Sequence, residues 1–375
     1  MTTMTATPAT LPPVRLDAHG HAITREKAEE ILHRNLLPSW RQSAGNAVQR
    51  IITQANLQQD YVAKSNAINW ALGNDGKLRM NVGDVSLRVH SNALGQSAEL
   101  ADIPQAYITT LMEQAPDLLV HNLNKRFLRR GNTQQLIRAV GDEDRAILST
   151  QYKRINSAPI VENLAALAQK LGLVPMGGVA TDLRFGLRMC TPKVYEIMPG
   201  EFVMFGLNWT NSDFGKGAHG ISAFILRVIC NNGAVVESAL RQIHLGAKIT
   251  EDDVMSQRTI DLHTATAVSA TEDVVRAYLD PAKIEEKLEG VRLAAMKDVT
   301  PLRVEEFLKR HLTKEAVKLA KETYLSADVT MLPPGGSAWR VSNTLSWLAN
   351  QPDVDAETAL DYQTLAGKAL VQLSA

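Results

Sequence analysis

The chain has 375 residues, of which 45% are apolar, 21% are charged and 5% are aromatic. This composition excludes a chain that is disordered throughout, and the length suffices for about two domains or one large domain with appendages. The 40 basic and 40 acidic side chains cancel to a formal net charge of zero. The total charge therefore excludes a strongly basic nucleic-acid-binding protein but not a local basic patch.

The composition also bears on the cellular compartment. Two cysteines are too few for a secreted disulfide framework. Residues 1–13 are rich in Thr, Ala and Pro and lack the charged start and apolar stretch of a signal peptide. No run approaches the ~20 apolar residues that a membrane span requires. We therefore expect a protein of the host-cell cytoplasm with no membrane contact.

The first part of the chain predicts helices and extended segments. Residues 1–23 are predicted to be a flexible lead-in, and Thr24 caps a helix whose apolar repeat ends at Pro38. Residues 61–90 are predicted to be extended around a Gly-Asn-Asp-Gly turn, and Pro104 opens another helix. A further helix over residues 160–171 is closed by a glycine.

From residue 183 to residue 236 the pattern is typical of strands. Residues 193–209 predict a hairpin over the turn Pro199–Gly200. The segment 221–229 fits a helix by its apolar spacing and a strand by its β-branched content, and we favour the strand.

Beyond residue 250 the chain is predicted to be mostly helical, with a Pro-Pro-Gly-Gly linker near its end. The expected fold class is α+β: a central, mainly antiparallel sheet over residues 180–240 whose one face is covered by helices, with a helical C-terminal segment. The predicted units are the lead-in 1–23, an α+β core domain 24–330, a linker 331–336 and the C-terminal helical segment 337–375.

A series of short motifs runs from about residue 100 to residue 350. They are Ile103–Tyr107, Asn122–Asn124, Leu136–Arg138, Arg145–Ser149, Thr210–Gly215, Arg227–Gly233 and Ala338–Asn343. In this order they resemble a phage- and plasmid-borne family known only as a domain of unknown function, except that Asp213 stands where the family pattern has a glutamate. The resemblance implies no established activity, but its mobile-element setting raises the expectation of a role in DNA metabolism.

The segment from His121 to Ile155 carries eight basic residues against three acidic ones. On a helix, cations three and four residues apart are neighbours and could neutralise phosphates together, and a tyrosine nearby could stack on an unpaired base. The predicted nucleic-acid contacts are Lys125, Arg126, Arg129, Arg130, Arg138, Tyr152, Lys153, Arg154, Lys216 and Arg227. The alternative is a solvated helix face balanced by Asp142, Glu143 and Asp144.

The resulting hypothesis is a nucleic-acid-binding protein of a phage or plasmid. It would bind single-stranded DNA through a basic groove and anneal complementary strands during DNA recombination. It would assemble as a homo-oligomer. Another hypothesis is a phage protein that binds a host protein through its C-terminal helices.

A glycine-rich loop offers a different interpretation. Residues 215–220 match the G-x-G-x-x-G pattern of dinucleotide-binding sites. Such a site needs a strand directly before the loop and a helix directly after it, whereas this loop begins five residues after the strand predicted to end at Trp209. We therefore expect no cofactor. The competing interpretation is a β-hairpin loop whose Lys216 and His219 contact a polyanion.

The alternative function is an enzyme that acts on a nucleotide or small ligand through residues 208–244. Its catalytic candidates are His219, Cys230 and His244, which would have to converge in one pocket. The sequence Asp17-x-His19-x-His21 has metal-ligand side chains but no further cluster to complete a site, so no metal is predicted.

Overall fold

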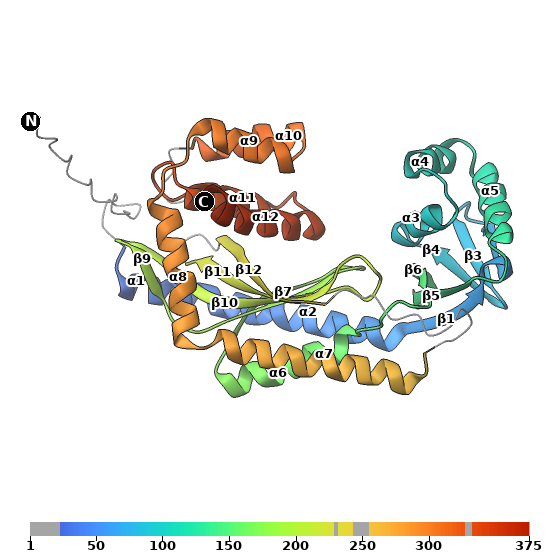
Figure 1. Cartoon of the computed structure of the whole chain (residues 1–375), viewed down its shortest axis with the longest axis horizontal. Coiled ribbons are helices and arrows are strands. Elements are labelled where there is room, and N and C mark those ends of the chain that lie inside the picture. The colour runs from blue at the N-terminus through green and yellow to red at the C-terminus, as the bar shows by residue number, and fades with distance from the viewer. Residues whose placement is uncertain (1–22, 229–231, 243–254, 327–331, 375) are drawn as a thin grey trace, which may run out of the picture.

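The computed structural model describes residues 23–228, 232–242, 255–326 and 332–374, which form a main body and a smaller lobe (Figure 1). The lobe comprises residues 58–149. Its elements are β1 (Gln58–Lys64), β2 (Ile68–Leu72), β3 (Leu78–Val82), β4 (Val85–Val89), α3 (Ser91–Leu100), α4 (Gln105–Gln114), α5 (Pro116–Arg129), β5 (Gln134–Val140) and β6 (Glu143–Ser149), with a 3-10 turn at Ser65–Ala67.

The lobe contains a six-stranded sheet in the order β1-β5-β6-β4-β3-β2. Every pairing is antiparallel except that of β4 with β6. Trp70, Met80 and Leu87 are buried on one face in the same core as residues of α3, α4 and α5. The alternating residues Asn69 and Ser86 are exposed on the other face, as expected for strands with one covered side.

The main body holds the remaining elements. They are α1 (Arg25–Ile31), a π-helical turn (Leu32–Leu36), α2 (Leu37–Leu57), α6 (Ser157–Leu171), β7 (Val174–Ala180), β8 (Phe185–Cys190), β9 (Tyr195–Met198), β10 (Glu201–Asn211), β11 (His219–Arg227), β12 (Asn232–Gln242), α7 (Gln257–Tyr278), α8 (Pro281–Met296), α9 (Pro301–His311), α10 (Lys314–Tyr324), α11 (Ala338–Ala349) and α12 (Ala356–Ser374). Its sheet is antiparallel in the order β12-β11-β10-β8-β7, and β9 pairs with β10.

Helices cover both faces of the main sheet, not one face as expected from the sequence. His219 contacts Thr271 of α7 on one face, whereas Arg188 donates a hydrogen bond to Gln363 of α12 on the other. Figure 1 shows α11 and α12 across the sheet from α6 and α7. The predicted α+β class is confirmed, but the described residues form two sheets instead of one central sheet.

Several local predictions are also confirmed. The hairpin β9–β10 turns over Pro199–Gly200, where Gly200 has a φ of +74°. Gly172 ends α6 in the left-handed conformation with a φ of +67°. The ambiguous segment after residue 220 is strand β11.

The prediction that Pro38 ends the first helix is wrong. The chain passes through the π-helical turn into α2, where Pro38 lies in the first turn. A proline is tolerated there because the first amides of a helix have no intrahelical acceptor.

The C-terminal helices are packed firmly on the main body. Almost every side chain of α11 is buried, and Trp339 donates a hydrogen bond from Nε1 to Glu201 Oε1 over 3.2 Å. Leu332 is fully buried and Pro333 accepts a hydrogen bond from Arg340, so this end of the predicted linker is part of the packed structure. Among the described residues, no helix is both long and apolar enough to cross a membrane.

Candidate nucleic-acid interface

Helix α5 lies at the outer side of the lobe, and its sequence gives it two faces (Figure 1). Leu119, Leu123 and Phe127, four residues apart, are fully buried. The rings of Phe127 and Trp70 meet edge to face with centroids 5.3 Å apart. The apolar face of α5 is therefore fixed on the core of the lobe.

One polar side chain fixes α5 further. The side-chain amide of Asn124 accepts a hydrogen bond from the backbone N–H of Trp70 over 2.8 Å and donates one to the carbonyl of Trp70 over 2.9 Å. Because β2 is an edge strand, these backbone groups have no partner strand on that side. Asn124 thereby satisfies them and sets the position of the outer face of α5.

The outer face carries a cation cluster formed by Lys125, Arg126 and Arg129. All three side chains are exposed, and none has an acidic partner within 4.0 Å among the residues that the structure describes. They lie within about 6 Å along the axis, given the ~1.5 Å rise per helical residue. Elsewhere in the lobe, Arg88 is paired with Asp142 at 2.9 Å. The α5 cluster thus presents uncompensated positive charge to solvent.

A shallow cavity of about 340 Å³ adjoins the cluster. Its lining includes Lys125, His121, Val120 and Leu128, which is 62% exposed, and also the acidic residue Asp117. A cationic surface with an apolar hollow beside it can contact both the phosphates and a base of an unpaired strand.

The other predicted contacts differ in accessibility. Lys216 is exposed at the tip of the β10–β11 hairpin, and Lys153 is half-buried. Arg130 is half-buried and donates a hydrogen bond to the carbonyl of Leu100, at the end of α3, over 2.7 Å. Arg130 therefore serves the packing of α3 against α5.

Arg138 is buried where the lobe meets the main body. Its guanidinium donates hydrogen bonds to Asp60 Oδ1 (2.9 Å), to the carbonyl of Asp213 (2.7 Å) and to Asn156 Oδ1 (2.9 Å). Burial opposes the charged form, but Asp60 and Asp213 outweigh it and raise the pKa of Arg138. This arginine is committed to internal partners and is not available to phosphate.

Two neighbours of Arg138 are also enclosed. Arg154 is buried and pairs with Asp60 Oδ2 at 3.3 Å. Tyr152 is buried, and its hydroxyl donates a hydrogen bond to the carbonyl of Ser212 over 3.0 Å. Burial raises the pKa of this phenol above its ordinary value. The ring of Tyr152 is thus not exposed for stacking on a base.

Arg227 and His219 lie inside the main body. Arg227 is fully buried and pairs with Glu201, with Nη2 and Oε2 3.2 Å apart. His219 is fully buried between Trp209 Nε1, 3.3 Å from its Nδ1, and Thr271 Oγ1, 3.0 Å from its Nε2. Neither side chain reaches solvent, so His219 cannot meet a ligand in this conformation.

Cys230, His244 and the Asp17-x-His19-x-His21 sequence lie outside the described residues. The glycine-rich loop leads directly into strand β11, not into a helix, so it lacks the helix N-terminus of a dinucleotide site. Within the described part of the chain, no three His, Cys, Asp or Glu side chains gather as a metal site.

The sequence did not reveal the joint between lobe and main body. There the tip of the β10–β11 hairpin presents three successive carbonyls to side chains: Ser212 to Tyr152, Asp213 to Arg138, and Phe214 to Asn92 and Gln96. Burial raises the pKa of the Asp213 carboxyl, although Arg138 and hydrogen bonds from Ser157 oppose the shift. The motif Thr210–Gly215 is the only sequence signal, and it marks this joint.

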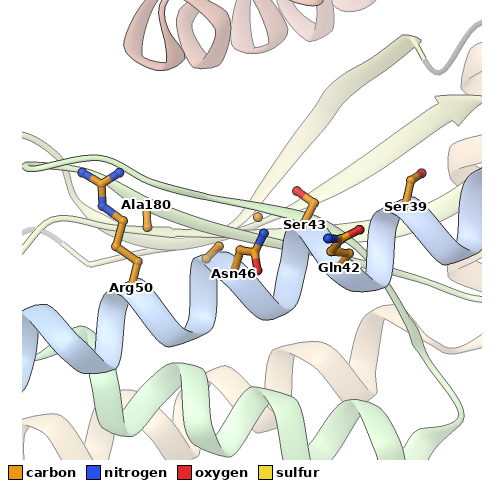
Figure 2. Close-up of a pocket in the computed structure, with 8 residues that line it drawn as sticks. Ser39, Gln42, Ser43, Asn46, Arg50 and Ala180 are labelled. Atoms are coloured by element: carbon orange, nitrogen blue, oxygen red, sulfur yellow. The ribbon is translucent and has the colours of Figure 1, made fainter.

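A polar groove of about 400 Å³ that the sequence did not predict lies between α2 and β7 (Figure 2). Its α2 wall consists of Ser39, Gln42, Ser43, Asn46 and Arg50, and Gly178 and Ala180 of β7 line the other side. The i, i+3, i+4, i+7, i+11 spacing of the α2 residues was the available signal. Arg50 is paired with Asp182 at 3.0 Å, so this groove has no uncompensated charge to attract a polyanion.

Comparison of the chain with protein families, curated proteins and solved structures finds no match.

Proposed function

We propose that this protein binds single-stranded nucleic acid through the outer face of α5, in the DNA metabolism of a phage or plasmid. The observation that carries the proposal is the α5 cluster, in which three exposed cations have no acidic partner among the described residues. Anionic phosphates are the natural partners of such a cluster, and release of their counterions supplies affinity.

Other features support a single strand as the ligand. The hollow beside Lys125 and Leu128 offers an apolar contact to a base that is not held in a duplex. The resemblance of the sequence motifs to a phage- and plasmid-borne family supports a DNA substrate. We further propose that the protein anneals complementary strands and assembles with copies of itself.

The test is fluorescence anisotropy with labelled single-stranded and duplex DNA over a salt series. Substitution of Lys125, Arg126 and Arg129 by Ala should weaken single-strand binding on the order of tenfold and reduce the salt slope by about 2, since each phosphate contact contributes ~0.7. The same variant should also anneal complementary strands more slowly in a strand-annealing assay.

A matched triple variant controls for total charge. Substituting Lys309, Arg310 and Lys318 by Ala removes the same charge from α9 and α10, on the main body. Its affinity should equal that of the unaltered protein. If the two triple variants bind equally well, or if the unaltered protein does not bind at low salt, α5 is not a nucleic-acid interface.

A further inference from the structure

A cavity of about 430 Å³ lies in the main body, where three segments meet. These are the end of α6 at residues 171–173, the segment 191–195 that enters β9, and the α7–α8 junction at residues 279–285. Figure 1 shows α8 and β9 at the opposite end of the molecule from α5. The cavity is therefore separate from the proposed nucleic-acid interface.

The walls of this α6–α8 pocket are mainly apolar. Leu173 and Ile284 are buried members of the main core, and Leu171 and Leu279 are half-buried against it. Its volume falls in the range of roughly 300–1,000 Å³ that is typical of small-molecule sites, which are apolar with a few placed polar groups. Transfer of the apolar part of a small ligand from water into this pocket would therefore be favourable.

The pocket has one uncommitted charge. Lys193 lines it with an exposed side chain, and no carboxylate lies within 4.0 Å of its ammonium among the residues that the structure describes. The carboxylate of Glu285, which also lines the pocket, pairs with Arg292, and Arg292 also pairs with Glu289 at 3.0 Å. The phenol of Tyr195 adds a hydrogen-bonding group. Within the lining, Lys193 is therefore the cation that an anionic ligand can meet.

We propose that the α6–α8 pocket binds a small amphiphilic anion, with its apolar body against Leu171, Leu279 and Ile284 and its carboxylate, sulfonate or phosphate on Lys193. This site is independent of the proposed nucleic-acid binding. The walls would accept either an aliphatic or an aromatic group, and the test below distinguishes between these two kinds of ligand.

The probe is 8-anilinonaphthalene-1-sulfonate, titrated by its fluorescence into the full-length protein. We expect one saturable site. Stronger displacement of the probe by decanoate would indicate a ligand with an aliphatic body, and stronger displacement by naphthalene-1-carboxylate would indicate an aromatic one. Lys193→Met should lower the affinity for the probe by about two- to fivefold, which corresponds to the loss of an exposed ion pair. Lys193→Glu should lower this affinity further. Leu279→Trp, which fills the cavity, should remove the saturable signal.

Lys318→Glu on α10 reverses a charge outside the pocket and is the control for non-specific dye binding. Melting curves establish that each variant is folded, and if Leu279→Trp does not fold, the Lys193 series decides alone. The proposal is overturned if Lys193→Glu binds the probe as Lys318→Glu does, if uncharged decanol displaces the probe as well as decanoate, or if no saturable site exists. Single-stranded DNA binding should be the same in Lys193→Met and the unaltered protein.

Discussion

The carboxyl group of Asp144 is fully buried in the lobe, on strand β6. Its Oδ1 accepts a hydrogen bond from the backbone N–H of Ala146 over 3.1 Å, but Oδ2 has no partner among the described residues. Burial raises the pKa of Asp144 well above its ordinary value, and the charge of Glu143 adds to the shift. Ionisation of this group in the folded protein is therefore unfavourable.

The pH dependence of stability should report this group. Because the pKa of Asp144 is raised on folding, its contribution is fully present below the unfolded pKa, near 3.8, and is lost as pH rises towards the folded pKa. Asp144→Asn cannot ionise, so its melting temperature relative to the unaltered protein should rise between pH 4 and pH 8. A constant difference across this range would show that folding does not raise the pKa of Asp144.

At the same scale, the sequence could predict some exposed cations but not the buried ones. Lys125, Arg126 and Arg129 are exposed because the helical spacing of their apolar neighbours directs those neighbours inward. Arg138 has the same chemistry, but its burial depends on Asp60, 78 residues away, and on Asp213, 75 residues away. Local spacing contains no information about such distant partners.

Among the elements, the contact of α2 with β7 depends on a glycine. A Cβ added at Gly178 would lie 2.5 Å from Ala47 Cβ and 3.2 Å from the carbonyl oxygen of Gly186. Both neighbours are fixed, one by its short side chain on α2 and the other by the backbone of β8. The helix and strand approach as closely as they do because this position has no side chain.

Gly178→Ala should therefore reduce the free energy of unfolding by about 1–3 kcal/mol, the usual cost of overpacking. Gly45→Ala is the matched control, because a Cβ there meets nothing within 4 Å and the position is in the interior of α2. It should instead stabilise the protein by about 0.5–1 kcal/mol. Urea denaturation measures both, and equal effects would contradict the close contact.

Element predictions succeeded where local chemistry decides the structure. The Pro-Gly turn before β10 and the glycine after α6 act within a few residues, and both were predicted. The β5–β6 hairpin was not predicted, because its charged residues are also typical of a solvated basic surface. Gly141 between its strands has the positive φ of a tight turn, +61°. The sequence did not predict α2, because a proline can end a helix as well as begin one.

At the scale of the whole molecule, the buried network around Arg138 joins the lobe to the main body. Arg138→Met would remove the hydrogen bonds to Asp60 Oδ1 and to the carbonyl of Asp213, while Arg154 would still pair with Asp60 Oδ2. An unsatisfied buried acceptor costs about 1–3 kcal/mol, so the variant should unfold at a lower urea concentration.

Arg88→Met is the control for Arg138→Met, because it breaks an exposed pair with Asp142 in the same lobe. It should cost less than about 1 kcal/mol. Similar unfolding midpoints for the two variants would mean that the joint contributes little to stability.

The sequence predicted the α+β class but only one of the two sheets. The main sheet follows from long β-branched and aromatic segments between residues 183 and 236. The sheet of the lobe combines strands from both sides of three helices, so β1 pairs with β5 across α3, α4 and α5. Such non-local pairing is not encoded in the pattern of any one segment.

The order of elements also constrains how the chain can fold during synthesis. Helix α2 precedes the whole lobe, whereas β7, which covers Ala44 and Ala47 of α2, follows it. At roughly 5–20 residues per second, a ribosome needs on the order of 10 s to make the intervening segment. When β6 completes the lobe at residue 149, β7 has not been made and the face of α2 that it covers is open. We therefore expect nascent chains to expose this face of α2 until β7 has been synthesised.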